Sequence, residues 1–303
     1  MSARLSGDAA GIARAIKILD EGGLVAIPTE TVYGLAADAA NADAVARVFA
    51  AKGRPAFNPL IAHVRDAVMA GELVAVEPLA RELMARFWPG PLTLVLPVRS
   101  DAPVAALARA GLRTLAVRAP AHPVAQAVIA GLGRAVVAPS ANVSGGLSPT
   151  RAEHVTLDVP VLDGGPCRWG VESTIVGVAN GRATLLRPGA SAASALGVPL
   201  DMRADGEGIV APGQMLSHYA PRQPVRLNAV AREGDEYLVG FGAVAGDETL
   251  SAHGDVVEAA ARLFDALHRA QASGRARIAV APVPEVGLGV AINDRLRRAA
   301  APR

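Results

Sequence analysis

Short apolar runs that end at proline or glycine recur along the first two-thirds of the chain. The run LVAIP (24–28) follows residues 8–20, where Ile12, Ile16 and Leu19 recur at helical spacing. Short buried strands mixed with helices predict an α/β domain whose sheet is covered on at least one face. Further strand-like runs are at 92–97, 114–120, 134–139, 159–165, 172–178 and 183–189, and helical patterns are at 42–51, 77–87 and 122–131.

The last three of these strand-like runs, between residues 159 and 189, lie very close together in the sequence. The few residues between them leave no room for a helix. Parallel neighbours need a long crossover connection, whereas antiparallel neighbours can be joined by a tight turn. We therefore expect part of the sheet to be antiparallel.

A long segment without a strong period, residues 197–224, separates this region from a second α/β pattern. The segment contains four prolines and four glycines, and a loop of this length is either a linker or functional. The pattern beyond it alternates apolar runs with helices near 255–272 and 288–300, where Val257, Ala260, Phe264 and Leu267 share a face. It predicts a small Rossmann-like unit, and since no G-x-G-x-x-G motif is present, no dinucleotide site is expected. The expected divisions are 1–200 for the larger domain, 201–224 for a linker and lid, and 225–303 for the second domain.

Composition narrows the class of protein. The formal net charge is only +2 over 303 residues, which argues against a strongly basic nucleic-acid-binding protein, and 51% hydrophobic residues argue against a disordered chain. No apolar run is long enough to span a membrane, and the first residues lack a signal-peptide core. A single cysteine, Cys167, excludes a disulfide framework. We expect a soluble, cytoplasmic protein.

Several predicted strands run into polar clusters. Thr29-Glu30-Thr31 follows LVAIP, Ser140-Ala141-Asn142 follows RAVVAP, and Arg187 precedes a Pro-Gly turn. Thr114 and Arg118 belong to one strand. Each cluster alone is as well explained by turn formation, but together they favour a ligand site where loops meet at strand ends.

The two lysines of the chain contrast with its 28 arginines. Lys17 lies in a helical pattern, whereas Lys52 lies two residues before Arg54 in KGRP. If KGRP is extended, both side chains project from the same face and suit a polyanion such as a nucleoside triphosphate. A solvated basic surface is the alternative. No Walker A loop is present, so a phosphate site would be built from side chains.

Other reactive groups are weaker candidates. Cys167 has no histidine near it in sequence, which favours a buried, inert thiol. The six histidines lack metal-ligand spacing, and no G-x-S-x-G elbow is present. No metal ligands from the protein alone are therefore expected.

The motifs together resemble those of a known family. PTETVYGL (28–35), KGRPAFNPL (52–60), APSAN (138–142) and ESTIV (172–176) occur in the order found in YrdC-like domains. Further matching motifs are FWPGPLT (87–93), TLAVRAPAHP (114–123), DGGP (163–166), LRPG (186–189), APGQMLSHYAP (211–221) and GLGVAINDRLRRAA (287–300). The whole set is similar to the two-domain form of the threonylcarbamoyl-AMP synthase family.

This resemblance implies a YrdC-like twisted mixed sheet with flanking helices and a smaller Rossmann-like second domain. It also implies a nucleotidyltransferase that condenses L-threonine, bicarbonate and ATP, with Mg²⁺, into threonylcarbamoyl-AMP and pyrophosphate. A partner complex would then transfer the threonylcarbamoyl group to tRNA, and weak direct contact with tRNA is a further expectation.

The resemblance also implies roles for individual residues, with Lys52 and Arg54 as the catalytic pair. The linker differs from the common family pattern at Gln214 and at Leu216-Ser217, so details of its contacts are left open. The expected threonine-binding residues are Thr31, His63, Arg118, Ala138 and Ser173, and the expected ATP-binding residues are Arg54, Asn58, Thr114, Ser140, Ser148, Arg187 and Tyr219.

Two other functions remain as alternatives. The first is an RNA-binding or ribosome-associated module, because YrdC-like domains can show a concave basic surface, although the nearly neutral charge argues against it. A carbamoyltransferase related to hydrogenase maturation would use carbamoyl phosphate. Those proteins are much longer and carry cysteine clusters that this sequence lacks.

Overall fold

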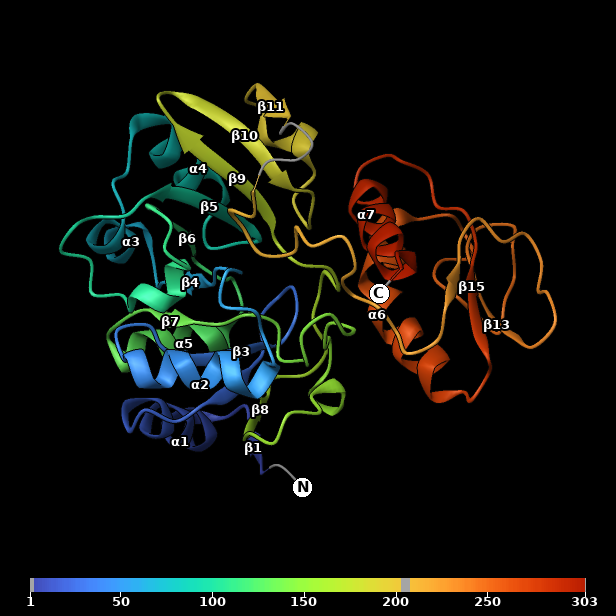
Figure 1. Ribbon diagram of the computed structural model, residues 1–303, viewed down its shortest axis with the longest axis horizontal. Helices are drawn as coiled ribbons and strands as arrows, with labels where there is room; N and C mark the ends of the chain where they lie inside the picture. Colours follow the sequence, from blue (N-terminus) through green and yellow to red (C-terminus); the bar gives the residue numbers. More distant parts are fainter. Residues whose placement is uncertain (1–2, 203–207, 303) are drawn as a thin grey trace.

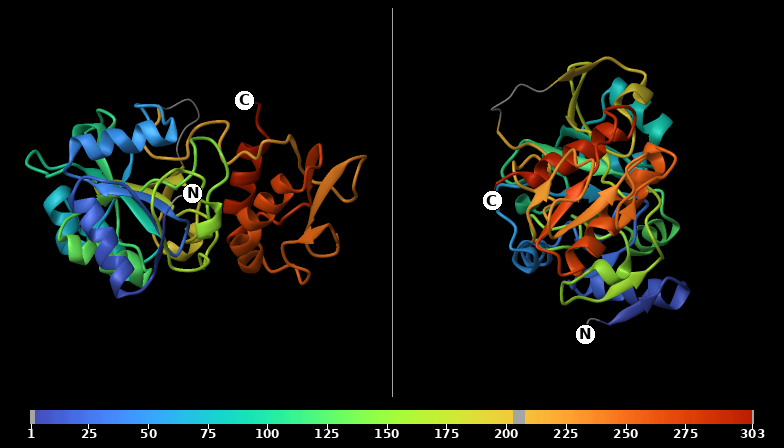
Figure 2. Two further views of the ribbon diagram at one scale, coloured as in Figure 1. Left: turned by 90° about the horizontal axis from the view of Figure 1, so that it is seen from below. Right: turned by 90° about the vertical axis from the view of Figure 1, so that its right-hand side faces the viewer.

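A large N-terminal body and a smaller C-terminal body lie side by side in the protein (Figures 1 and 2). The structure is a computed structural model that describes residues 3–202 and 208–302. Residues 203–207 of the predicted linker therefore lie outside the described part. Among the described residues, no helix has both the length and the hydropathy needed to cross a bilayer.

The large body is built on one mixed sheet of eleven strands. Its order is β1-β8-β2-β3-β7-β4-β6-β5-β9-β10-β11. Helices flank this sheet (Figure 1), and every residue of β2, β3 and β4 is buried. The mixed α/β architecture predicted from the sequence is confirmed. The strands are β1 Arg4–Ser6, β2 Val25–Ile27, β3 Gly34–Asp38, β4 Ile61–His63, β5 Leu92–Pro97, β6 Thr114–Arg118, β7 Val136–Val137, β8 Val161–Asp163, β9 Thr174–Ala179, β10 Arg182–Arg187 and β11 Leu200–Met202.

The helices of this body begin and end at the signals expected from the sequence. In α1, the Asp8 carboxylate caps the first turn by accepting a hydrogen bond from the Gly11 amide, and Leu19 is buried on the inner face. Helix α2 is followed by the capping residue Gly53, which adopts a left-handed conformation that glycine tolerates without strain. The helices are α1 Ala9–Asp20, α2 Ala42–Lys52, α3 Ala67–Leu73, α4 Pro78–Phe87 and α5 Pro123–Leu132, with short 3-10 turns at Ala106–Arg109, Ala152–His154 and Ala193–Leu196.

The closely spaced strands of residues 159–189 follow the prediction only in part. Strands β9 and β10 form the expected antiparallel pair. Strand β8 instead lies between β1 and β2, parallel to both, at the other end of the sheet. The segment between β8 and β9 thus spans the width of the domain, and it carries Cys167 and Glu172 with it.

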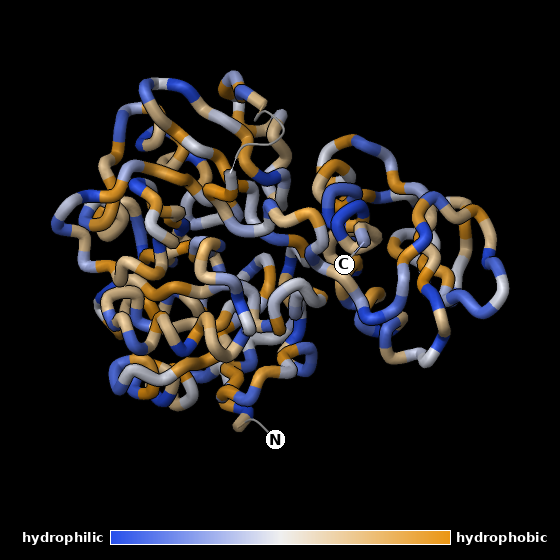
Figure 3. The backbone as a smooth tube through the Cα atoms, in the orientation of Figure 1, coloured by the Kyte–Doolittle hydropathy of each residue, from blue (hydrophilic) through white to orange (hydrophobic). Residues whose placement is uncertain are grey.

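The small body is an all-parallel sheet of order β12-β15-β13-β14 with two helices. Ala260, Phe264 and Leu267 are buried in its core as predicted, but Val257 is half exposed. Hydrophobic segments occur throughout both bodies (Figure 3), and the buried apolar residues form two main clusters, one centred in each body. The elements are β12 Val225–Arg226, β13 Glu236–Gly240, β14 Glu248–Thr249, β15 Arg277–Val280, α6 Val256–Ala272 and α7 Gly289–Ala300.

The second core is not confined to the second domain. It includes Leu147, Val171 and Ala190 of the first domain together with Tyr219 of the linker. These residues pack with the inner faces of α6 and α7. Burial of apolar surface therefore joins the second domain to the edge of the first domain.

Candidate active site

A cavity lies where the ends of several strands of the large sheet meet the linker. Ligands of open α/β sheets bind at such ends, because the loops that follow the strands converge there. Side chains at or next to the ends of β2, β4, β6, β7, β9 and β10 line it, and the linker forms one side. The lining residues are Thr29, Thr31, Val32, Arg54, Ile61, His63, Arg118, Ala138, Pro139, Ser140, Glu172, Ser173, Arg187, Pro212, Gly213, His218 and Tyr219.

Most of the site residues expected from the sequence therefore face a single cavity, although they come from distant parts of the chain. Four of the expected residues do not line it: Lys52, Asn58, Thr114 and Ser148. Lys52, Asn58 and Ser148 lie behind the lining residues and support them. Thr114 lies elsewhere on the sheet.

Arg118, at the end of β6, lines the cavity and forms a buried ion pair. Its Nη2 lies 2.6 Å from Glu30 Oε1, and its Nη1 donates to Thr31 Oγ1 at 2.9 Å. Burial raises the pKa of the Glu30 carboxyl, but the charge of Arg118 and the hydrogen bonds to the carboxylate together outweigh burial and leave that pKa below its ordinary value. Arg118 is thus held rigidly with one edge beside the small hydroxyl of Thr31. Sequence analysis placed Glu30 in the same polar cluster but gave it no role.

His63 is a neutral imidazole in this wall. Burial, reinforced by the charge of Arg118, lowers its pKa to about 3. Its Nδ1 lies 3.3 Å from the carbonyl oxygen of Ile61. If Nδ1 carries the proton and donates to this carbonyl, Nε2 is left as a hydrogen-bond acceptor.

Arg187 and Ser173 form a second fixed pair at the ends of the antiparallel strands. The Arg187 Nη2 donates to the Ser173 carbonyl at 2.9 Å and to its Oγ at 3.1 Å. The Ser173 hydroxyl also lies 2.7 Å from Thr93 Oγ1. This network positions a buried guanidinium against the cavity.

The segment KGRP is not extended, so the prediction that Lys52 and Arg54 project from one face is wrong. Lys52 is the last residue of α2, and Gly53 reverses the chain. The Lys52 ammonium is buried and donates to the carbonyl oxygens of Ser140 and Asn142, each at 2.5 Å. Lys52 therefore shapes the loop after β7 from behind, and burial, with the charge of Arg54, lowers its pKa well below the ordinary value.

Arg54 faces the cavity and is held by the loop that follows it. Its Nη2 donates to Asn58 Oδ1 and to the Pro59 carbonyl, both at 2.7 Å. Burial lowers its pKa to about 10, so the guanidinium keeps its proton at neutral pH. Asn58 thus orients Arg54 rather than lining the cavity.

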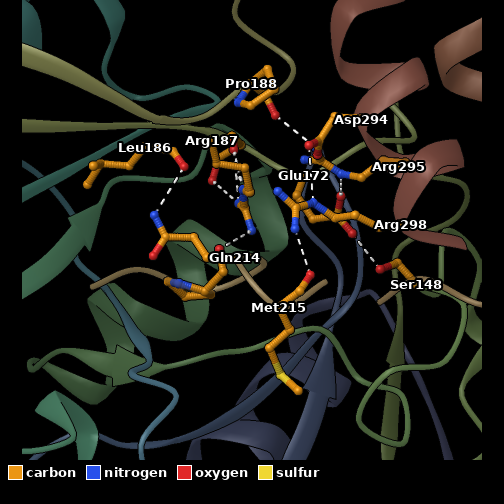
Figure 4. Close-up of polar contacts among 12 residues, drawn as sticks. Ser148, Glu172, Leu186, Arg187, Pro188, Gln214, Met215, Asp294, Arg295 and Arg298 are labelled. Atoms are coloured by element: carbon orange, nitrogen blue, oxygen red, sulfur yellow. Dashed lines mark hydrogen bonds and ion pairs between the residues drawn. The ribbon is translucent and has the colours of Figure 1, made fainter. Parts of the chain in front are cut away.

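Glu172 is a lining residue that sequence analysis did not single out. Its carboxylate accepts a hydrogen bond from the Ser148 hydroxyl. It also forms an ion pair with Arg295 of α7, whose Nε donates to Glu172 Oε2 at 2.7 Å (Figure 4). The available signal was its place in ESTIV, directly before Ser173. No sequence pattern connected it to Arg295.

Thr114 stands at the opposite end of β6 from Arg118. It faces a separate groove on the sheet, which also contains Leu186 and Val210. Ala211 of the linker is completely buried on the sheet surface with Ile61, Val95, Ala116 and Ile175. The linker therefore covers part of the sheet beside the cavity.

The linker side of the cavity depends on His218 and Tyr219. Tyr219 is fully buried, with a positive φ of 60°, and its ring lies 5.9 Å from Phe264 and 4.9 Å from the Arg295 guanidinium. Burial lowers the pKa of His218 to about 3, which keeps its ring neutral. Residues of both domains hold this segment: the His218 amide donates to the Arg298 carbonyl at 3.3 Å, and the Ala220 amide donates to the Gly145 carbonyl at 2.8 Å.

Candidate groups for other chemistry are few. Cys167 is buried, and burial raises the pKa of its thiol, in agreement with an unreactive cysteine. Within residues 3–202 and 208–302, no three His, Cys, Asp or Glu side chains are grouped to hold a metal ion. The donor set of the cavity does not suit a metal held by the protein alone.

Comparison with known proteins agrees with this arrangement. Residues 17–189 match the family model described as "Telomere recombination" (Sua5_yciO_yrdC), and residues 190–301 match "Threonylcarbamoyl-AMP synthase, C-terminal domain". The threonylcarbamoyl-AMP synthase of Bacillus subtilis is 38% identical, over 96% of this chain and 93% of its own length. The enzyme of that name from Pyrococcus abyssi is 40% identical, over 92% of this chain and 91% of its own.

The chain belongs to the threonylcarbamoyl-AMP synthase family. The crystal structure of P. abyssi Sua5 complexed with L-threonine is similar to it, with a TM-score of 0.89 and 36% identity. That similarity covers 99% of this chain and 97% of the other. The mixed-sheet fold with a smaller second domain, predicted from the motifs of this family, is therefore confirmed.

Proposed function

We propose that the protein synthesises threonylcarbamoyl-AMP as a nucleotidyltransferase, from L-threonine, bicarbonate and ATP. The observation that carries this proposal is the gathering of Arg54, Arg118 and Arg187 with small hydroxyl groups in one cavity. Three guanidinium groups suit a carboxylate and a polyphosphate at the same time. The family membership narrows these anions to threonine and ATP.

The threonine subsite is assigned to the side of the cavity formed by Arg118, Thr31 and His63. The Arg118 edge beside Thr31 Oγ1 would bind the substrate carboxylate by charge-assisted hydrogen bonds. The neutral His63 would accept a hydrogen bond from the threonine hydroxyl. Ala138, through its backbone, and Ser173 complete the proposed subsite.

The ATP subsite is assigned to Arg54, Ser140, Arg187 and Tyr219, with Thr114 as its far end. Asn58 and Ser148 contribute by holding Arg54 and Glu172. A nucleotide that reached from Arg187 to Thr114 would cross the sheet surface covered by Ala211. We therefore propose that residues 208–219 move when ATP binds, and act as a lid.

In the proposed reaction, bicarbonate and the threonine amine first give N-carboxythreonine with loss of water. A carboxylate oxygen of this carbamate then attacks the α-phosphorus of ATP. The new oxygen–phosphorus bond forms as the bond to the β-phosphate oxygen breaks, and pyrophosphate leaves with the electron pair. Fixed guanidinium groups stabilise the charge that develops on the phosphates.

Mg²⁺ would enter this site with ATP, where it neutralises phosphate charge. The residues of this chain supply orientation and exclusion of water, which the mixed anhydride needs because it hydrolyses easily. The product would serve a separate complex that transfers the threonylcarbamoyl group to tRNA. Direct contact with tRNA and a cytoplasmic location are part of the same proposal.

The test is mass spectrometry of the product formed with ¹³C-bicarbonate. We expect threonylcarbamoyl-AMP carrying the label, and pyrophosphate release that requires ATP, threonine and bicarbonate together. Pyrophosphate release without threonine, or an unlabelled product, would contradict the proposal.

A further inference from the structure

Arg295, in the last helix of the second domain, reaches into the wall of the first-domain cavity. Its side chain is 1% exposed, and its Nε donates to Glu172 Oε2 at 2.7 Å. Figure 4 shows Arg295 extending from the side of α7 toward Glu172, beside the strand end that carries Arg187. A residue more than 120 positions away in the chain thus forms an ion pair with a cavity-lining carboxylate.

Glu172 has no other cationic hydrogen-bond partner among the described residues. Its second oxygen accepts a hydrogen bond from the uncharged hydroxyl of Ser148. Burial alone raises the pKa of this carboxyl, but the charges of Arg295 and Arg187 outweigh burial and keep the pKa below its ordinary value. The carboxylate is therefore ionised, and its charge is balanced chiefly by Arg295.

The position of Glu172 makes this balance important for an anionic ligand. Glu172 and Arg187 line the same cavity, where the ATP phosphates are proposed to bind. An unbalanced carboxylate in this wall would repel the phosphates and compete with them for Arg187. Its effect on threonine would be smaller, because Arg118 is paired with its own carboxylate, Glu30.

Arg295 is itself fixed by its neighbours. Its Nη1 donates to the Pro188 carbonyl at 2.9 Å and to Asp294 Oδ2 at 2.6 Å, and its guanidinium lies over the ring of Tyr219. Pro188 follows Arg187 directly, so these bonds fix the guanidinium against the strand end.

We propose that Arg295 is a positioning residue that neutralises Glu172, so that the ATP subsite is completed by the second domain. Arg295 acts through Glu172 and does not touch the substrates. This inference rests on the proposed function, because it assumes that ATP phosphates occupy the cavity. It assigns a specific role in catalysis to a domain whose motifs indicated none.

The test compares variants of the full chain by steady-state release of pyrophosphate. Arg295→Met removes the charge but keeps much of the side-chain volume, and Arg295→Met with Glu172→Gln removes both charges. Arg151→Met is the matched control, since it breaks another ion pair between the domains, with Asp265 at 3.1 Å. Neither Arg151 nor Asp265 lines the cavity.

We expect Arg295→Met to raise the KM for ATP on the order of tenfold, with the KM for threonine nearly unchanged. Adding Glu172→Gln should recover most of this loss, and Arg151→Met should have a normal KM for both substrates. In the Glu172→Gln background, Arg295→Met should change the KM for ATP by less than about twofold. This last comparison remains decisive if the single variant Arg295→Met fails to fold.

Three results would overturn the inference. The first is an unchanged KM for ATP in Arg295→Met. The second is an equal rise in the KM for ATP and in the KM for threonine that the double variant does not reverse, which indicates a purely structural role. The third is a rise in the KM for ATP, on adding Arg295→Met to Glu172→Gln, as large as that expected for Arg295→Met alone. If the unsubstituted chain made no threonylcarbamoyl-AMP, the proposed function itself would fail, and this would be evident before any variant was compared.

Discussion

The cavity has a strand wall, formed by Thr31, His63, Arg118 and Ser173, and a linker wall, formed by residues 212–219. Side chains of the strand wall stand at strand ends or in the loops beside them, and polar groups of the large sheet hold them: Arg118 donates to Thr31, and Ser173 lies within hydrogen-bond distance of Thr93. The linker wall contains no helix or strand. It is attached through a few bonds such as Arg298 Nη1 to the Met215 carbonyl at 2.6 Å and Gln214 Nε2 to the Leu186 carbonyl at 3.3 Å (Figure 4).

This difference assigns different tasks to the two walls. Segments with few backbone hydrogen bonds to their surroundings open at lower free-energy cost than the strands of a sheet. A preformed strand wall suits the small substrate, threonine, whose groups need fixed partners. A wall that opens suits ATP, which is larger and must leave as pyrophosphate and adenylate.

The largest expected effect comes from the cation that borders both walls. Arg54→Ala should lower turnover by about 10²-fold or more, because a fixed electrostatic donor to the phosphates is lost. Arg54→Ala should also lower the thermal stability, because Arg54 donates to Asn58 Oδ1 and to the Pro59 carbonyl, and pyrophosphate release with melting curves measures both effects. Lys52→Ala serves as the comparison, since it also removes a donor to two buried carbonyls but Lys52 does not line the cavity, so its turnover should fall less for a similar loss of stability. Near-normal turnover in Arg54→Ala would contradict the assignment of this residue to ATP.

A smaller and more selective effect is expected within the strand wall. Arg118→Met should raise the KM for threonine about tenfold or more, with little change in the KM for ATP, because a charge-assisted contact with the carboxylate is lost. It should also destabilise the fold, because Glu30 is left buried without its cation.

Arg118→Met combined with Glu30→Gln separates these two effects. We expect this pair to regain stability while the KM for threonine stays high. A rise in the KM for ATP instead would place Arg118 in the phosphate subsite.

The smallest expected effect concerns pH and the contact between the domains. Burial, together with the neighbouring His268, lowers the pKa of His154 from 6.5 to about 4, and the two rings stack with centroids 3.9 Å apart. The unfolded chain therefore takes up a proton near pH 6.5 that the folded chain accepts only near pH 4. The free energy of unfolding should fall as the pH decreases through this interval.

Urea unfolding between pH 7 and pH 4 measures this slope. His154→Gln should make the slope shallower, while His253→Gln, at an exposed position, should leave it unchanged. An identical slope in wild type and His154→Gln would show that His154 does not contribute to the acid sensitivity.

The two walls also differ in how far the sequence predicted them. The residues of the strand wall could be predicted from the sequence, because apolar runs predict strands. The polar residues that follow these runs gather where the strand ends meet. Arg118, Ser140 and Arg187 were identified in this way. The contacts behind the wall could not be predicted, because the inward position of Lys52 depends on the end of α2 packing against the loop after β7.

The linker wall and its support from the second domain could not be derived from local patterns. The burial of Ala211 depends on how the linker folds back over the large sheet, and the pairing of Glu172 with Arg295 depends on how the two domains pack. No periodicity in the sequence records either kind of packing. The motif resemblance did point to Tyr219, but not to Phe264 or Arg295 on either side of it. Prediction from sequence was therefore strongest where secondary structure positions a residue and weakest where tertiary packing does.

Hydrogen exchange of the full chain, measured peptide by peptide with each substrate, tests the contrast between the walls most directly. Threonine alone should increase protection at residues 114–118 and leave residues 208–219 unchanged. MgATP should change the exchange of residues 208–219 while β6 keeps its protection. Exchange of 208–219 that is the same with and without MgATP, under conditions in which the product forms, would contradict the account of a linker wall that opens.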